Sequence, residues 1–358
     1  MIVIQSTLGL LIKAYNKISL LNKKLQRNES EYLKGLRVLS LFSGIGAFEE
    51  ALKNINIDFK LVNYCEFDSS VSKAYSIIHN VDEKLNLGDI TTIDENKLDD
   101  FDLMTYGFPC QDISALGDQK GLMDENGALT RSGLFFEAVR IAKKKLPKYL
   151  LAENVRMLVS KKFKTQFREM LKLLDEIGYN TYWQVLNSKD YGVPHSRNRV
   201  FLVSIRKDID DGQFKFPEKI QLSKKASDFY DSFASQDHYL REKDMKYLSE
   251  FRLKKKYSSL NSDIIICQTT KQGNLANPQN FIRDKKGYRV MTSRELLALQ
   301  GFKKKYAEAL LNEGFTKEQI GKFSGNSITV DVLERIFEKL LHTGIKVENK
   351  ILKNENII

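Results

Sequence analysis

Apolar residues along this chain form short continuous runs that are separated by stretches with helical spacing. The runs cover 37–42, 61–66, 101–107, 149–153, 182–186 and 199–205, each of a length typical of a buried strand. Helical spacing covers 47–53, begins again near Ser69, and returns over 134–145 and 164–177. Strands that alternate with helices in this way predict an α/β fold with a doubly wound parallel sheet.

The alternation ends near Asp208 and gives the expected domain division. Residues 208–287 hold short polar pieces and predict a small, mostly irregular domain, after which helical spacing returns at 293–299 and 331–341. The apolar spacing over 8–26 predicts an amphipathic helix before the main domain, and we expect it either to pack against that domain or to bind DNA or a partner. We expect an N-terminal helical extension (1–34), a main domain (35–207), a small domain (208–287), a C-terminal segment (288–345) and a polar tail (346–358).

Charge and hydropathy narrow the function classes. Lysine and arginine number 57 against 46 aspartate and glutamate residues, a formal net charge of +11 at pH 7. The excess suits a polyanionic partner such as nucleic acid, although a lysine-rich proteome would also produce it. No apolar run is long enough to span a bilayer, and segment 1–13 lacks the features of a secretory signal. We therefore expect a cytoplasmic protein.

The cysteines provide one candidate for chemistry. Cys65, Cys110 and Cys267 show no paired spacing, so we expect neither a metal site nor a disulfide framework. Pro109 restricts the backbone just before Cys110, and polar residues follow it. Cys110 is either a small core residue or a reactive thiol, and this loop-like setting favours the thiol.

Three segments that follow the strands predict a nucleoside site. Segment 42–46 follows the first strand, Glu66 ends the second, and residues 89–90 follow the next helix. Ligands of open parallel sheets lie beyond the carboxyl ends of the strands, where an acid typically binds ribose hydroxyls. Glu49 replaces the last glycine of the dinucleotide fingerprint, so a nucleoside without pyrophosphate is favoured. S-adenosylmethionine fits, with its sulfonium against an aromatic face. The candidate residues are Phe42, Ser43, Gly44, Ile45, Gly46, Glu66, Asp89 and Ile90.

The ordered motifs resemble those of the cytosine-C5 DNA methyltransferases. Segments 42–46, 107–111 and 153–155 are similar to the first, nucleophile and acid motifs of that family. Segments 289–302 and 325–330 resemble its ninth and tenth motifs, in the family's order and without circular permutation. The resemblance implies a Rossmann-like sheet that binds S-adenosylmethionine and releases S-adenosylhomocysteine. It also implies a DNA (cytosine-5-)-methyltransferase of the bacterial restriction-modification type, with 208–287 as its target-recognition domain.

The implied reaction gives Cys110 and Glu153 defined tasks. Addition of a thiolate to carbon 6 of a flipped-out cytosine makes carbon 5 nucleophilic enough to accept a methyl group. Glu153 can assist by hydrogen bonding to ring nitrogen 3 and the exocyclic amine. The sequence does not name the base that later removes the carbon 5 proton, and water can serve.

The resemblance also implies supporting roles. Asn154 would hold the nucleophile loop, Arg197 would bind the cytosine carbonyl oxygen, and Arg199 would serve the architecture or contact phosphates. The C-terminal helix would return to the first strand and complete the cofactor pocket. Further cofactor contacts would be Phe67, Gly107, Pro109, Leu134, Asn326 and Ser327, while Gln111 and Ser114 would contact DNA, Ser114 from a loop that closes over it.

Three differences from the family pattern concern the site. His195 replaces the glutamine of the usual Gln-x-Arg-x-Arg motif, and it either contacts the DNA backbone or is an ordinary surface residue. Phe67 stands where tryptophan often faces the adenine. Residues inserted near 126–132 lengthen the nucleophile loop.

A polar cluster in the recognition segment is a candidate for reading bases in the major groove. The same residues could equally form an ordinary solvated loop. They are Thr270, Lys271, Gln272 and Asn274. The target sequence cannot be derived, but the short segment favours a single site.

Three other functions compete with the main one. A tRNA methyltransferase of the same fold is opposed by the intact recognition segment and Gln111. A nucleotide-dependent oxidoreductase would need the phosphate loop that is absent, and a silent DNA-binding module would have lost Cys110 or Glu153. The expected partners are double-stranded DNA and a possible cognate restriction endonuclease, and we expect a monomer associated with the nucleoid.

Overall fold

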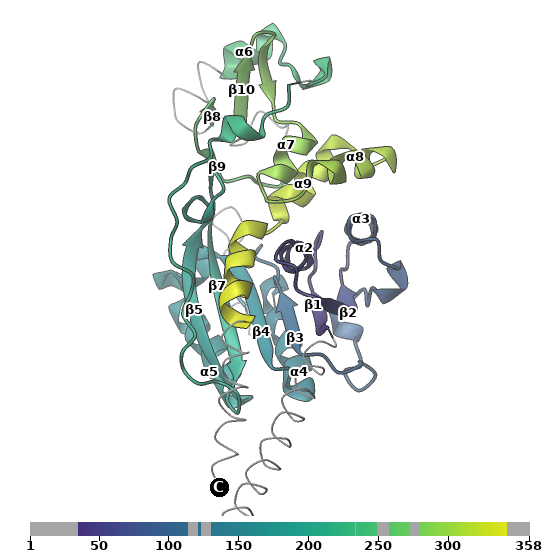
Figure 1. Ribbon diagram of the computed structural model, residues 1–358, viewed down its shortest axis with the longest axis vertical. Coiled ribbons are helices and arrows are strands. Elements are labelled where there is room, and N and C mark those ends of the chain that lie inside the picture. Colours follow the sequence, from purple (N-terminus) through teal and green to yellow (C-terminus); the bar gives the residue numbers. More distant parts are fainter. Residues whose placement is uncertain are drawn as a thin grey trace, which may run out of the picture.

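The computed structural model describes residues 35–113, 121–122, 130–232, 234–248, 258–272 and 279–341. The helix expected within 8–26, the tail 346–358, Ser114 and Asn274 lie outside these residues. Figure 1 shows a large sheet in the lower part of the molecule and a small lobe at the top, which holds β8 (Ser259–Leu260), β10 (Asn280–Asp284) and α6 (Glu242–Tyr247). Helices α7 (Ser293–Ala298), α8 (Lys304–Asn312) and α9 (Lys317–Asn326) lie between them.

The six apolar runs all form strands of one sheet, as predicted. They are β1 (Leu36–Leu41), β2 (Phe59–Cys65), β3 (Leu103–Tyr106), β4 (Tyr149–Val155), β5 (Tyr179–Asn187) and β7 (Asn198–Arg206). Their order is β2-β1-β3-β4-β7-β5.

The expected fully parallel sheet is wrong at one strand. β1 pairs in parallel with β2 and β3, and β3 with β4, but β7 is antiparallel to both β4 and β5. The connection 188–197 holds only a 3-10 turn and the two-residue strand β6 (His195–Ser196). A parallel pair needs a longer crossover, so β5 and β7 pair as a hairpin does. The start of β7 therefore lies at the edge where β4 ends.

Alternate residues of the strands face two helical layers, because successive side chains of a strand point to opposite faces. Val38, Leu103, Leu151 and Val203 share a core with α2 (Ala47–Asn54), α3 (Ser69–His79) and the helical residues 330–341. Their neighbours Leu39, Met104, Leu150 and Leu202 share the second core with α4 (Phe135–Lys145) and α5 (Lys164–Glu176). The expected return of the C-terminal helix to the main sheet is thus observed (Figure 1).

Three helices, α3, α7 and α9, begin at capping residues whose side chains accept backbone hydrogen bonds. Thr292 and Glu295 form a capping box at α7 (Ser293–Ala298), and Thr316 and Gln319 form another at α9 (Lys317–Asn326). Asp68 accepts hydrogen bonds from two amides at the start of α3. Helix α8 (Lys304–Asn312) packs against both α7 and α3, so these helices join the small lobe to the sheet.

The small lobe is mostly irregular, as expected. Its regular elements are α6 (Glu242–Tyr247), β8 (Ser259–Leu260), β9 (Ile265–Ile266), β10 (Asn280–Asp284) and β11 (Gly287–Val290). β8, β10 and β11 form one small sheet, while β9 pairs with β6 and so joins the lobe to the main domain. β11 continues past the expected boundary at 287 to Val290.

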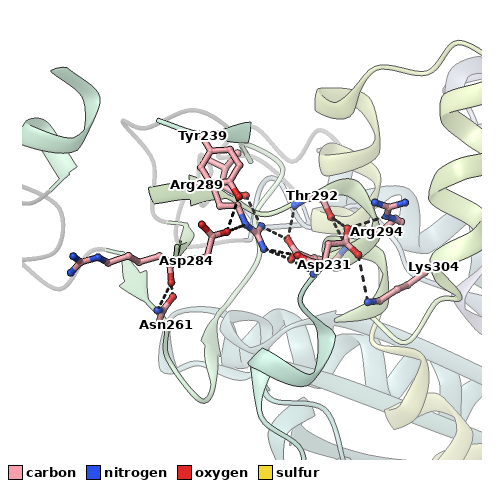
Figure 2. A network of polar contacts seen from close by, with 11 residues as sticks. Asp231, Tyr239, Asn261, Asp284, Arg289, Thr292, Arg294 and Lys304 are labelled. Atoms are coloured by element: carbon pink, nitrogen blue, oxygen red, sulfur yellow. Dashed lines mark hydrogen bonds and ion pairs between the residues drawn. The ribbon is translucent and has the colours of Figure 1, made fainter. Parts of the chain in front are cut away.

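A buried ion-pair network holds the lobe to α7 (Figure 2). Arg289 on β11 is 1% exposed and makes two hydrogen bonds, of 2.8 and 2.9 Å, to the fully buried Glu295 carboxylate. Its Nε also lies 3.3 Å from the Asp284 carboxylate. Asp231 accepts from Thr292 and Arg294 at 2.6 and 3.0 Å. The network ties three parts of the lobe to the first turn of one helix.

Candidate active site

The nucleophile loop is fixed at the carboxyl end of β3. Asn154 Nδ2 donates a hydrogen bond of 3.0 Å to the Phe108 carbonyl, and the Phe108 ring packs against Phe135 with 5.4 Å between centroids. Asp112 Oδ2 accepts from the Ser132 amide at 3.2 Å. These contacts leave the Cys110 thiol partly exposed on a loop whose backbone is anchored on both sides.

Glu153 lies beside Arg199 because of the antiparallel strand β7. Register pairs Glu153 with Phe201 and Val155 with Arg199, so the Glu153 and Arg199 side chains are diagonal neighbours on one face. Glu153 Oε1 lies 3.0 Å from Arg199 Nε. A Cβ placed on Gly107 would lie 3.9 Å from Glu153 Oε2, so the nucleophile loop passes directly over this carboxyl group. The antiparallel direction of β7 thus brings together three motifs that are distant in sequence: those that contain Gly107, Glu153 and Arg199.

Burial raises the pKa values of two groups at this site, the Glu153 carboxyl group and the Cys110 thiol. Burial raises the pKa of the Glu153 carboxyl group, and the nearby Arg199 and Arg197 oppose the shift only in part. Burial, followed by the Glu153 charge, also raises the pKa of the Cys110 thiol. A raised pKa favours the protonated form of a carboxyl group, which is the form that a general acid requires.

Arg197 does not reach the position that the sequence assigned to it. It is fully buried, and Nη1 donates to the Gln268 carbonyl at 3.0 Å and to Cys267 Sγ at 3.4 Å. Nη2 donates to the Gly325 and Ser327 carbonyls at 3.0 and 2.7 Å. All four Nη hydrogens are thus used within the protein, so contact with a cytosine carbonyl oxygen through them would break existing bonds. The expectation that Arg197 binds the cytosine carbonyl oxygen is therefore withdrawn.

His195 is neither a surface residue nor a contact to the DNA backbone. Its side chain is 0% exposed. Nδ1 lies 3.2 Å from the Leu299 carbonyl oxygen, and Nε2 accepts from the Gln268 amide at 3.0 Å. Both expectations fail because β6 pairs with β9 of the recognition lobe, and the residue Gln268 that follows β9 is hydrogen-bonded to the ring.

The cofactor candidates meet at the ends of β1 and β2. Glu66 Oε2 accepts from the Gly44 amide at 3.0 Å, and Oε1 accepts from the Asp68 amide at 2.9 Å. Ser43 donates its amide to the Cys65 carbonyl at 3.1 Å. The glycine turn and the strand-end acid therefore form one unit at the carboxyl ends of two adjacent parallel strands.

The backbone of this turn needs its glycines. Gly44 and Gly46 have φ values of 55° and 78°, and Phe42 also lies in the left-handed region at 51°. A Cβ on Gly46 would lie 2.1 Å from His79 Nε2, so a larger residue would displace that ring. His79 is buried, and its Nε2 lies 3.0 Å from the Ile45 carbonyl.

These residues fit S-adenosylmethionine. The Gly44 amide, which could otherwise face a phosphate, is already bonded to Glu66. Each Glu66 oxygen retains a lone pair for a ribose hydroxyl. Phe67 is 80% exposed and offers a free aromatic face next to that acid. The arrangement suits a nucleoside without a pyrophosphate.

The other candidate cofactor residues lie in different settings. Asp89 caps a short turn by accepting from the Thr91 amide at 2.9 Å, while Ile90 is buried. Ser327 is buried with its carbonyl bonded to Arg197, and Asn326 is exposed at the end of α9. Leu134 directly precedes α4 and is half-buried, as is Pro109.

The candidate DNA contacts are partly described. Gln111, Thr270 and Lys271 are exposed, and Gln272 is half-buried against Gly321 of α9. Gln272 Nε2 donates to the Thr269 carbonyl at 3.1 Å, so its amide is used within the loop.

Sequence reasoning missed the residues that connect the recognition segment to the main domain. Gln268 accepts from Arg197 with its carbonyl, donates its amide to His195, and accepts from Ser324 Oγ with its side chain at 2.6 Å. The only signal for this junction in the sequence was the replacement of the expected glutamine by His195. Neither periodicity nor motif spacing indicates which residue of the irregular recognition segment contacts His195.

The fold defines the class of protein. The chain superposes on the crystal structure of the S. pombe Dnmt2 methyltransferase with a TM-score of 0.69, at 24% identity and over 86% of this chain and 98% of that one. It also superposes on the Entamoeba histolytica methyltransferase EhMeth with a TM-score of 0.69, at 17% identity, over 86% and 98% of the two chains. The fold is that of an α/β methyltransferase. Within the described parts of the chain, no helix combines the length and apolar character needed to cross a bilayer.

Sequence comparison identifies the family. Residues 36–342 match the family model "C-5 cytosine-specific DNA methylase". The type II methyltransferase M2.ScrFI of Lactococcus lactis subsp. cremoris is 32% identical over 371 residues, which cover 85% of this chain and 99% of that protein. The chain therefore belongs to the C-5 cytosine-specific DNA methylase family.

Some relatives are much longer than the matched part. The orphan methyltransferase M.SPRI of Bacillus phage SPR is 44% identical over 174 residues, covering 49% of this chain and 38% of that protein. The match to M.Rho11sI of Bacillus phage rho11s, at 43% identity, covers 34% of that protein. The matched segment thus spans well under half of these two phage relatives.

Proposed function

We propose that this protein transfers a methyl group from S-adenosylmethionine to carbon 5 of a flipped-out cytosine in double-stranded DNA, through a covalent adduct between Cys110 and carbon 6. The observation that carries the proposal is the buried Glu153 carboxyl group, held 3.0 Å from Arg199 beneath the loop of Cys110. Family membership supports the reaction class.

The cofactor would bind at the ends of β1 and β2. Glu66 would hold the ribose hydroxyls, and Phe67 would lie against the adenine. When bound, S-adenosylmethionine supplies an electrophilic methyl group on a positively charged sulfur. The glycine turn 44–46 lets the backbone approach closely, and His79 supports that turn from behind.

The protein's own groups would prepare the cytosine. Cys110 Sγ, as thiolate, forms a bond to carbon 6, and the electron pair of the 5,6 double bond becomes available at carbon 5. Glu153 hydrogen-bonds ring nitrogen 3 and stabilises the negative charge that the addition places on the ring. After methyl transfer, loss of the carbon 5 proton restores the double bond and expels Cys110 as thiolate. Water can accept that proton.

Arg199, in place of Arg197, is the proposed contact to the cytosine carbonyl oxygen. Its Nε pairs with Glu153, and Nη1 donates to the Asn198 carbonyl at 2.8 Å. Nη2 is the group of this guanidinium that we assign to the base. Arg197 instead holds the Gln268, Gly325 and Ser327 carbonyls and so supports Arg199 through the local backbone.

Biological context and assembly remain predictions. Relatives include type II and orphan phage methyltransferases, so methylation here would protect host DNA with a cognate endonuclease or act without one. The proposed substrate would place the protein at the nucleoid. A monomeric state and target recognition by residues 208–287 follow from the family resemblance.

A transfer assay with labelled S-adenosylmethionine tests the proposal. The full chain is incubated with plasmid DNA or with tRNA, and modified cytosines in the DNA are located by bisulfite sequencing. We expect label in DNA at cytosines of one repeated sequence. Label in tRNA alone, or unmodified plasmid cytosines, would contradict the proposal.

A further inference from the structure

Three separate parts of the chain meet at the buried His195 side chain. His195 itself lies on β6, the Leu299 carbonyl follows α7, and the Gln268 amide belongs to the recognition segment just after β9. β6 and β9 also pair in parallel, with His195 opposite Ile265. The imidazole is therefore one point at which the recognition segment, the main domain and the C-terminal segment are joined.

The two hydrogen bonds fix the form of the ring. The Leu299 carbonyl can only accept and the Gln268 amide can only donate, so Nδ1 carries the hydrogen and the unprotonated Nε2 accepts. A glutamine carboxamide has the same pair, an N–H donor and an oxygen acceptor. A neutral histidine can thus perform the bridging task that a glutamine could perform at this position.

The charged neighbours all oppose a second proton on this ring. Burial, followed by the Arg197 and Arg199 charges, holds the pKa of His195 well below its usual range. Cys267, which directly precedes Gln268, accepts from Arg197 at 3.4 Å. A proton on Nε2 would also face the Gln268 amide hydrogen, so protonation would break this bridge.

The residues beyond Gln268 depend on the bridge for their position. The Gln268 carbonyl accepts from Arg197, whose neighbour in the motif, Arg199, pairs with Glu153. A Cβ on Gly325 would lie 2.2 Å from the Thr269 carbonyl oxygen, so the segment runs in direct contact with the end of α9. It then presents the exposed Thr270 and Lys271. One short segment therefore contacts Arg197 and also carries the candidate base-reading residues Thr270 and Lys271.

We propose that His195 is a positioning residue that couples DNA recognition to catalysis, because its neutral donor–acceptor bridge sets where segment 267–272 lies relative to the Glu153–Arg199 pair. This inference rests on the proposed function. In this proposal, the buried His195 side chain aligns the recognition loop with the reacting base.

Three substitutions in the full chain test the proposal. His195→Gln keeps a donor and an acceptor, His195→Asn is too short to span both partners, and His195→Ala removes both groups. His238→Gln is the matched control, because His238 is also a buried histidine, but of the recognition lobe away from this junction. For each variant, kcat, KM for DNA, the Kd of S-adenosylmethionine and the thermal midpoint are measured, with methylation of sites that differ by one base pair.

We expect His195→Gln and the His238→Gln control to stay within about twofold of wild type in KM for DNA. His195→Asn and His195→Ala should raise KM by about tenfold or more and methylate near-cognate sites more readily, because the Gln268 amide loses its partner. Their Kd for S-adenosylmethionine should not change. If His195→Ala fails to fold, the Gln and Asn variants still decide the matter.

Equal KM and equal site discrimination in the Asn and wild-type proteins would overturn the proposal. So would a Gln variant as impaired as Asn. Absence of DNA methylation by the wild-type protein would be a separate result, because it would refute the proposed function instead of the role of His195.

Discussion

The thiol that we propose as nucleophile is only weakly acidic in the absence of DNA. Burial and Glu153 raise the pKa of Cys110, whereas Arg197 and Arg199 outweigh burial at Cys267 and lower its pKa. Burial raises the pKa of Cys65 to about 12, and this thiol donates to the Gly88 carbonyl at 3.1 Å. The three cysteines should therefore differ in reactivity.

We expect iodoacetamide to alkylate Cys267 before Cys110 at pH 8 in the DNA-free protein, because the thiolate is the reacting form. Labelling of Cys110 should rise as the pH increases toward 10, and Cys65 should stay unlabelled in the folded protein. Peptide mass spectrometry across this pH series measures the order. Labelling of Cys110 first at pH 8 would show that its thiolate is already favoured without substrate.

Substitution of the proposed acid should affect chemistry more than binding. Glu153→Gln keeps the shape of the side chain but cannot transfer a proton, so we expect kcat to fall about a hundredfold or more. The Kd of S-adenosylmethionine should stay unchanged, and the exposed Glu308→Gln should behave as wild type. A kcat within a few-fold of wild type would remove Glu153 from the mechanism.

Single residues were predictable where one local motif carries the chemistry. The sequence was enough to select Cys110 after Pro109, and Glu153 and Glu66 at the ends of two strands. In the structure all three lie at the same edge of the sheet. The sequence assigned the cytosine carbonyl oxygen to Arg197 and the architecture or phosphates to Arg199. The motif alone could not show that Arg197 is bonded within the protein or that the register of β7 against β4 places Arg199 beside Glu153. The burial of His195 depends on β9, which is distant in sequence.

Strand and helix positions followed closely from the apolar pattern, since each element buries one or two faces. The direction of β7 did not, because hydrophobic periodicity is the same for parallel and antiparallel strands. This reversal is what places Arg199 beside Glu153. The two-residue strands β6 and β9 were likewise too short to produce a pattern.

The ion pair between β11 and α7 should be essential to the small lobe. Arg289→Ala would leave the fully buried Glu295 carboxylate without its partner, and we expect a loss of about 3–5 kcal/mol in the free energy of unfolding. Arg294→Ala is the control, because its ion pairs with Asp231 and Glu308 are partly exposed and should contribute less than about 1 kcal/mol. Urea unfolding measures both. Equal losses would contradict the importance of burial.

At the scale of the whole molecule, buried neutral histidines make stability depend on pH. Burial, helped by Lys53, lowers the pKa of His79 to about 3, and the pKa of His195 is also well below its usual range. As the pH falls below about 6.5, each histidine takes a proton in the unfolded chain but not in the folded one. Stability contributed by these groups is therefore present above pH 6.5 and is lost toward acid.

His195→Gln isolates one of these contributions. Relative to this variant, wild-type protein should lose up to about 1.4 kcal/mol of unfolding free energy per pH unit below pH 6.5. Urea unfolding at pH 7.5, 6 and 5 gives the difference between the two proteins. A difference that is constant over this range would mean that His195 titrates equally in the folded and unfolded states.

The overall arrangement was predictable only in part. The α/β sheet, the return of the C-terminal helix and an irregular lobe all followed from the pattern and the motif order. How the lobe joins the sheet did not, because the contacts of Gln268, Gly325 and Arg289 arise between segments far apart in the chain.

The most direct test of the account is to trap the bond between the protein and its base. Duplex DNA carrying 5-fluorocytosine at the cytosine identified by bisulfite sequencing is incubated with the protein and S-adenosylmethionine, because fluorine at carbon 5 prevents the final elimination. Denaturing gel electrophoresis and peptide mass spectrometry then locate the adduct. The account predicts a stable complex in which Cys110 Sγ is bonded to cytosine carbon 6, and none with Cys110→Ser. An adduct at another residue, or DNA methylation by Cys110→Ser at the wild-type rate, would contradict it.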